Sequence, residues 1–266
     1  MIDVLSKLRV NPPSDIWANR AALAAFGAGI YRFTDIGTTG SLWYYDGATW
    51  LQVGSIPLMS KSEGYIVASL TGATYSQTGT TITVTLANHR LTSALNGRLI
   101  YLTGTGGILS GWYKFTFVST SQFTCYWPVE QSITGNISNS SGEYVFDIAN
   151  VALPSGFFSN RTVEIRARFR YENGAVSTKN PRLYLNSTLL LTHTIANNIA
   201  ASAVNWELSD NGENAQTAFM NSGNLGTGTV GTSLENTGSS SCTIRISVNL
   251  ALSLTWACLD FVEAIL

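Results

Sequence analysis

The sequence predicts a mostly β protein with short N-terminal helices and a β-hairpin, a small β-module, and a C-terminal β-sandwich of jelly-roll type. Apolar and polar residues alternate over many short runs, and turns rich in Gly, Ser and Asn separate these runs. Helical periodicity is confined to the N-terminus. Because 266 residues exceed the usual size of one domain, and residues 54–64 and 130–142 have the composition of linkers, we expect three units: residues 1–58, 59–140 and 141–266.

The first unit begins with two predicted helices. The first covers residues 2–9, places Ile2, Leu5 and Leu8 roughly on one face, and ends before a Pro-Pro pair. The second covers residues 14–27, with Ser14 or Asp15 as the N-cap and Gly27 after its last turn.

A β-hairpin is predicted over residues 40–54, GSLWYYDGATWLQVG. Asp46-Gly47 favours a two-residue type I′ turn, which places Trp43 opposite Trp50. Both faces of this ribbon are apolar, whereas a hairpin with one solvated face should alternate.

The first ~55 residues are too few to build a sizeable core alone. We therefore expect their aromatic residues to be buried between copies of the chain or against a docking partner; the alternative is packing on the rest of the same chain. The candidates for an oligomer interface are Trp17, Phe26, Tyr31, Phe33, Trp43, Tyr45 and Trp50.

The middle unit shows four strand-like runs, residues 80–91, 97–104, 111–119 and 121–129. Two of these runs contain a pair of adjacent aromatic residues beside Gly, Ser and Pro: Trp112-Tyr113 and Tyr126-Trp127. Adjacent residues of a strand point to opposite faces. One member of each pair should therefore be core, and the other could form a saccharide platform. The candidates for receptor contact in this unit are Trp112, Tyr113 and Trp127.

The third unit contains the clearest strand, residues 161–171, with apolar residues on one face and Glu and Arg on the other. Residues 171–180 form a predicted polar loop at one end of the sandwich, where recognition is often located. An acidic segment, NWELSDNGEN, could hold a saccharide or Ca²⁺, although it lacks the spacing of a calcium loop. The candidates for receptor contact in this unit are Tyr171, Asn173, Asn180 and Asp210.

Composition excludes several classes of partner. Charged residues are only 12% and the net charge is −1, so no basic patch suits nucleic acid. No apolar run is long enough to insert into a membrane, and the first residues do not resemble a signal peptide. The chain has three widely spaced cysteines, Cys125, Cys242 and Cys258. Their odd number and spacing favour unpaired, buried thiols in a protein that is made in a reducing cytoplasm.

Motifs in all three units resemble bacteriophage fibre proteins. Residues 30–54 resemble the W-x-x-D-G-x-x-W hairpins near the start of many such proteins. Residues 157–188 and 254–266 resemble the first strands and the closing strand of a C-terminal sandwich in phage structural proteins. Residues 83–128 resemble a small β-module repeated in phage tail fibres. The matching positions of that module are His89, Leu91, Gly111, Tyr113, Ser119, Phe123 and Thr124, with Arg90 where the family usually has Gly.

The resemblance implies a virion structural protein: a homotrimeric tail-fibre subunit that binds a bacterial surface polysaccharide and attaches to phage tail or baseplate proteins. The protein would be made in the host cytoplasm and located in the phage tail. The alternatives are a tail-associated glycan depolymerase or esterase, and a capsid head fibre or decoration protein.

The sequence offers little for catalysis. His89 and His193 are the two histidines. The first lies at a predicted turn, and no His, Cys or acidic residue follows or precedes the second at metal-ligand spacing. No G-x-S-x-G motif is present, and the sparse acids show no paired arrangement typical of a glycosidase. We therefore expect no catalytic residue, no metal and no cofactor.

Overall fold

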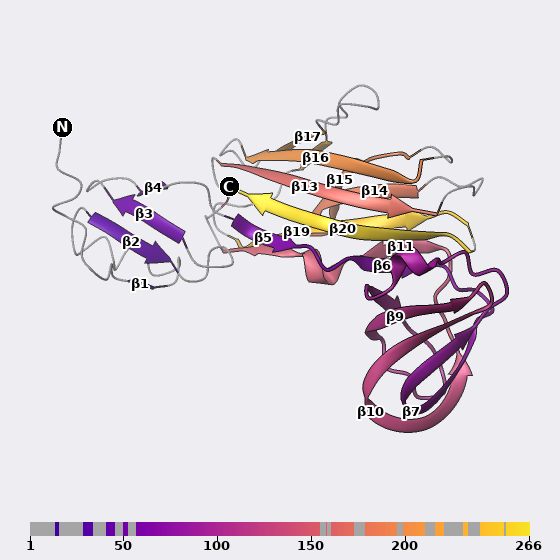
Figure 1. Ribbon diagram of the computed structural model, residues 1–266. Coiled ribbons are helices and arrows are strands. Elements are labelled where there is room, and N and C mark those ends of the chain that lie inside the picture. The colour runs from indigo at the N-terminus through magenta and orange to yellow at the C-terminus, as the bar shows by residue number, and fades with distance from the viewer. Residues whose placement is uncertain are drawn as a thin grey trace.

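The computed structural model is mostly β, as the sequence predicts (Figure 1). It describes residues 14–15, 29–33, 41–45, 50–52, 57–154, 158, 161–172, 179–195, 199–210, 216–220, 231–233, 240–252 and 254–266. The strands form a four-stranded, an 11-stranded and a five-stranded sheet. The predicted N-terminal helices lie outside the described residues, except for Ser14–Asp15, which form a short strand.

The N-terminal sheet contains four short strands: β1 (Ser14–Asp15), β2 (Gly29–Phe33), β3 (Ser41–Tyr45) and β4 (Trp50–Gln52). The predicted hairpin is present, but its predicted register is wrong, because Tyr45 pairs with Trp50 and Trp43 pairs with Gln52. The connection is therefore longer than two residues, and longer hairpin loops are also common. The Asp-Gly pair thus identifies the hairpin without identifying its register.

Two aromatic residues of this sheet are buried within the single chain. Trp43 is 1% exposed and Tyr31 is 3% exposed, and both belong to the same apolar cluster as the sandwich core. The guanidinium carbon of Arg161 lies 4.6 Å from the centre of the Trp43 ring. Packing on the same chain, the alternative to an oligomer interface, therefore holds for Tyr31 and Trp43. The other interface candidates have side chains outside the described part of the structure: Trp17, Phe26, Phe33, Tyr45 and Trp50.

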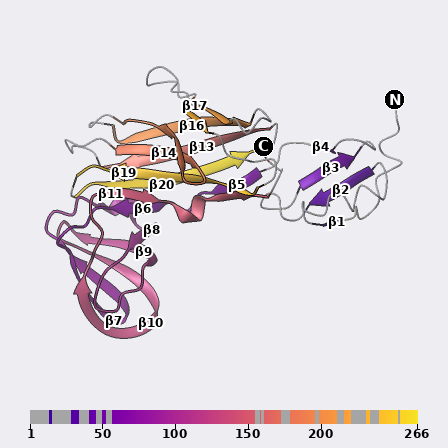
Figure 2. The ribbon, with the colours of Figure 1, turned by 180° about the vertical axis from the view of Figure 1, so that it is seen from behind.

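The sandwich consists of two packed antiparallel layers (Figures 1 and 2). The first layer has the order β18 (Gly231–Ser233), β17 (Gln216–Met220), β16 (Ala201–Asp210), β13 (Thr162–Tyr171) and β20 (Trp256–Ile265). The second contains β15 (Thr188–Thr192), β14 (Lys179–Leu185) and β19 (Cys242–Leu250), with β11 (Gly142–Val145) and β12 (Val151–Leu153) on the far edge of β19. Strand β13 alternates as predicted, with its apolar side chains in the core. The jelly-roll subtype stays a prediction.

The large sheet continues from the sandwich into the middle module. Strands β5 (Pro57–Lys61) and β6 (Tyr65–Ala68) pair with β20, so residues 57–61 form a strand and not a linker. Strand β6 then pairs in parallel with β8 (Leu99–Leu102). The sheet therefore crosses the boundary predicted between residues 58 and 59.

The middle module adds β9 (Gly111–Ser119), β10 (Gln122–Asn136) and β7 (Thr74–Thr85) to this sheet, and η3 (Ser93–Leu95) to its connections. Strand β10 extends into the segment predicted as a second linker. The module has its own apolar core, which includes Phe115, Phe123 and Trp256 of β20. A second short helical turn, η4 (Asp147–Ala149), follows the module.

Two carboxylates join the module to the sandwich. Asp260 of β20 accepts hydrogen bonds from Arg98 at 2.7 Å and from Arg170 at 2.5 and 2.8 Å. Glu172, after β13, lies 3.3 Å from Arg90 and 3.9 Å from the ammonium group of the fully buried Lys179. Each carboxylate therefore bridges a cation of the module and a cation of the sandwich.

Candidate functional site: the corner pocket and the hydroxyl face

The chain makes a sharp corner after β7. Asn88 and Arg90 have φ angles of 55° and 58°, in the left-handed region that few non-glycine residues adopt. His89 lies between them and is 1% exposed. This conformation needs strong local support, and His89 supplies it.

Both ring nitrogens of His89 bind the backbone. Nδ1 accepts a hydrogen bond from the Leu91 amide at 3.1 Å, so Nε2 carries the proton that it donates to the Ser119 carbonyl at 2.8 Å. The ring also packs edge-on against Phe117 and Phe123, at centroid distances of 5.9 and 5.4 Å. His89 is therefore a structural residue that holds the corner against the β9–β10 turn.

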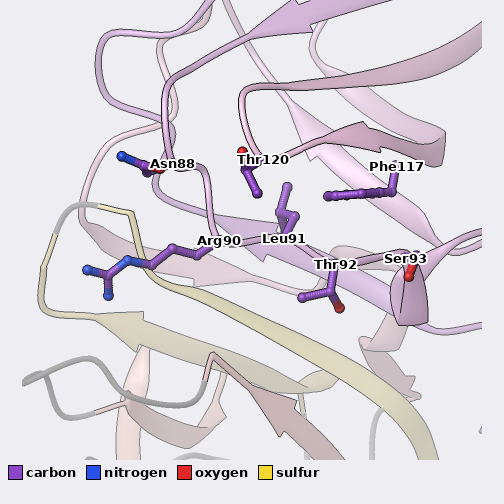
Figure 3. Close-up of a pocket in the computed structure, with 7 residues that line it drawn as sticks. All are labelled: Asn88, Arg90, Leu91, Thr92, Ser93, Phe117 and Thr120. Carbon is purple, nitrogen blue, oxygen red and sulfur yellow. The ribbon is translucent and has the colours of Figure 1, made fainter.

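A pocket with a volume of about 300 Å³ lies at this corner (Figure 3). Its lining comes from the corner itself, from the start of η3 and from the end of the β9–β10 hairpin: Asn88, Arg90, Leu91, Thr92, Ser93, Phe117 and Thr120. We call this cavity the corner pocket.

Arg90 links the corner pocket to the sandwich. Its guanidinium group pairs with Glu172, and its carbonyl accepts a hydrogen bond from the Trp256 indole at 2.9 Å. These contacts explain how an arginine can occupy a position where a glycine would be less strained, because the side chain compensates for the backbone conformation.

This explanation predicts which of two Arg90 variants is the more stable. Arg90→Ala removes the ion pair but keeps a side chain in the left-handed region, whereas Arg90→Gly removes both the ion pair and the strain. We expect Arg90→Gly to be more stable than Arg90→Ala by about 1 kcal/mol in urea unfolding. Equal stability of the two variants would show that the corner is not strained.

The outer surface of the β7–β10–β9 sheet carries a regular array of hydroxyl groups. Tyr126 lies between Thr81 and Lys114 on the neighbouring strands, and Thr124 lies between Thr83 and Thr116. We call this surface the hydroxyl face. Its residues are Thr81, Thr83, Thr85, Lys114, Thr116, Gln122, Thr124 and Tyr126.

Tyr126 is the most prominent side chain of the hydroxyl face. It is 55% exposed, and its cross-strand neighbours are threonine and lysine. No residue of the face is a carboxylate. An exposed ring among hydroxyl groups can stack on the apolar side of a sugar ring while the hydroxyls bind its polar edge.

Some residues predicted to contact a receptor are buried. Tyr113 is 1% exposed, and burial raises its pKa to about 12. Tyr171 is 2% exposed and hydrogen-bonded to Ser202 at 2.9 Å; Asp210 is 5% exposed at the end of β16. A buried side chain cannot contact a receptor, so these three assignments are wrong for this conformation.

The remaining candidates are partly buried or lie outside the described residues. Trp112 donates a hydrogen bond to Asp147 at 2.9 Å and packs edge-on against Tyr65 and Tyr101, so it belongs to the junction of module and sandwich. Trp127 packs on Tyr113 with a centroid distance of 5.1 Å. Asn180 is half-buried in β14. Asn173 lies outside the described residues.

Sequence reasoning did not select Tyr126, Asn88, Thr92 or Phe117. The signal for Tyr126 was available, because Phe123 and Cys125 alternate with it and are core residues. The sequence carries no such signal for the corner pocket, because the pocket forms only where the β9–β10 turn approaches a corner that is distant in sequence.

Two other kinds of site are absent from the described residues. In that part of the chain, no three His, Cys, Asp or Glu side chains lie close enough together to hold a metal ion. No described helix has the length and apolar character needed to cross a membrane.

No model of a known protein family and no curated protein matches the sequence. Among solved structures, the CBM2 module of an evolved Dit protein from Lactobacillus casei BL23 phage J-1 is 9% identical, with 77% of this chain and 96% of that chain covered and a TM-score of 0.30. A structure of infectious bursal disease virus, Gt strain, is 8% identical over 90% of this chain and 70% of that one, with a TM-score of 0.20. The VP2 subviral particle of infectious bursal disease virus is 12% identical, with the same shares covered and a TM-score of 0.19. TM-scores below 0.5 do not establish a common fold.

Proposed function

We propose that the protein is a bacteriophage tail-fibre subunit that adheres to a bacterial surface polysaccharide through the hydroxyl face of its middle module. The observation that carries this proposal is the 55% exposed ring of Tyr126 on the central strand of the hydroxyl face, between Thr81 and Lys114. The array lies on a paired antiparallel sheet, so the backbone that carries it is already ordered before binding, which reduces the entropy lost on association.

Adhesion without turnover fits this surface better than hydrolysis. Glycoside hydrolysis needs two carboxyl groups on either side of the sugar bond, and the hydroxyl face offers none. The virion location, the homotrimer and attachment to tail or baseplate proteins rest on the resemblance of the sequence motifs to phage fibre proteins. Light scattering of the full chain tests the trimer.

Tyr126→Ala should weaken adhesion at least tenfold, because aromatic residues at the centre of an interface are often binding hot spots. Its effect on unfolding should stay within about 0.5 kcal/mol, since the side chain is exposed. The measurement is binding of the full chain to a glycan array and to bacterial cells to which the wild-type protein adheres.

Leu189→Ala is the matched control. Leu189 is 43% exposed on the sandwich, away from the hydroxyl face, so the variant should adhere like the wild type. Unchanged adhesion of Tyr126→Ala, or release of sugar from the glycan by the wild-type protein, would contradict the proposed function.

A further inference from the structure

The corner pocket lies at the turn end of the β9–β10 hairpin that also carries Thr116, Gln122 and Thr124 of the hydroxyl face. Phe117 pairs with the core residue Phe123, so its side chain is on the opposite side of the sheet from that face. A glycan on the face would reach the pocket around this turn, beside the exposed Thr120. A volume of about 300 Å³ is at the lower end for small-molecule sites, which favours a single sugar residue.

The charge in the corner pocket is already compensated. Among the described residues that line it, Arg90 is the one that carries a charge, and its guanidinium group lies 3.3 Å from the carboxylate of Glu172, whose side chain is 7% exposed. In Figure 3 the Arg90 guanidinium points away from Phe117 and Ser93. The pocket therefore favours an uncharged group.

The centre of the corner pocket is apolar and its rim is polar. Leu91 and the ring of Phe117 lie together in the middle, next to Thr120 (Figure 3). The side chains of Asn88, Thr92 and Ser93 are exposed and place a carboxamide and two hydroxyls around them. A methyl group attached to an amide matches this arrangement, because the methyl can fill the centre while the amide binds the rim.

We propose that the corner pocket binds the N-acetyl group of an amino sugar in the glycan that the protein recognises. This inference rests on the proposed function and specifies which class of sugar the recognised polysaccharide contains. Both ring nitrogens of His89 hydrogen-bond to the backbone, at Leu91 and Ser119, and so hold the corner that supplies most of the lining against the β9–β10 turn. A backbone that is held before binding can select one substituent over another.

N,N′,N″-Triacetylchitotriose, called chitotriose below, and cellotriose test the inference, because these β-1,4-linked trisaccharides differ at C2, where the first has an acetamido group and cellotriose a hydroxyl. The full-length protein should bind chitotriose at least tenfold more tightly in calorimetric or NMR titrations, because filling an apolar pocket with one additional carbon group can change affinity by that factor or more.

Asn88→Gly removes a rim group without a backbone penalty, because the residue already has a φ of 55°. We expect this variant to lose most of the preference for chitotriose. Thr92→Phe, at an exposed position, should fill the pocket and abolish the preference. Asn186→Gly is the matched control, since Asn186 also has a positive φ, 54°, but follows β14 in the sandwich. This variant should keep the preference for chitotriose.

Equal affinity for the two trisaccharides, or a preference that survives both Asn88→Gly and Thr92→Phe, would overturn the inference. If Tyr126→Ala weakens adhesion to a polysaccharide at least tenfold in that case, the proposed function stands and only the N-acetyl site is wrong. If the wild-type protein binds no glycan at all, both fail.

Discussion

Replacement of Trp43 by alanine should lower the free energy of unfolding by about 3–5 kcal/mol, because the side chain is almost completely buried and its removal leaves a large cavity. Trp43 is 1% exposed, shares the sandwich core cluster and lies under the Arg161 guanidinium at 4.6 Å. Loss of this cation–π contact adds to the cavity term. The measurement is urea unfolding followed by circular dichroism.

Protein concentration separates burial within the chain from burial between subunits. If Trp43 is buried within the chain, the loss for Trp43→Ala should be the same at low and high protein concentration. For an interface residue the loss would instead depend on concentration, since the variant would dissociate at concentrations at which the wild-type assembly persists. A concentration-dependent loss, or no loss, would contradict the packing of Trp43 on its own chain.

The sequence predicts the local features of this fold well. The alternation in residues 161–171 correctly places Val163, Ile165 and Phe169 in the core, because a strand with one solvated face has a period of two. The same rule predicts that one member of each adjacent aromatic pair is buried. Choosing Tyr126 as the exposed member requires following that alternation from Phe123 and Cys125.

The sequence predicts long-range pairing poorly. Strand β5 pairs with β20, about two hundred residues later, and nothing in the composition of residues 57–61 indicates that partner. The salt bridge between Arg90 and Glu172 likewise joins residues that are 82 positions apart. The junction and the corner pocket depend on such contacts, so local patterns could not predict them.

Glu172→Gln should be the second strongly destabilising substitution. Glu172 is 6% exposed and its carboxylate faces Arg90 and the buried ammonium group of Lys179. Removing one partner of a buried ion pair costs about 3–5 kcal/mol. The buried Lys179 ammonium would keep its hydrogen bond to the Glu172 carbonyl but lose the carboxylate that compensates its charge. Glu164→Gln is the matched control, since Glu164 pairs with Arg166 on the outer face of β13, where the two side chains are 35% and 51% exposed, and a pair open to solvent should contribute little.

The loss caused by Glu172→Gln should become smaller as the pH rises. Burial lowers the pKa of Lys179 from its ordinary value of 10.5, and the carboxylate of Glu172 opposes that shift. Without the carboxylate, the pKa of Lys179 falls further, so the folded variant loses this proton at a lower pH than the unfolded chain does. Folded protein then binds fewer protons than unfolded protein, and stability rises with pH between the two pKa values. Urea unfolding at about pH 7 and about pH 9.5 measures this effect; a difference from the wild type that stays constant or grows with pH would show that Lys179 does not carry the cost.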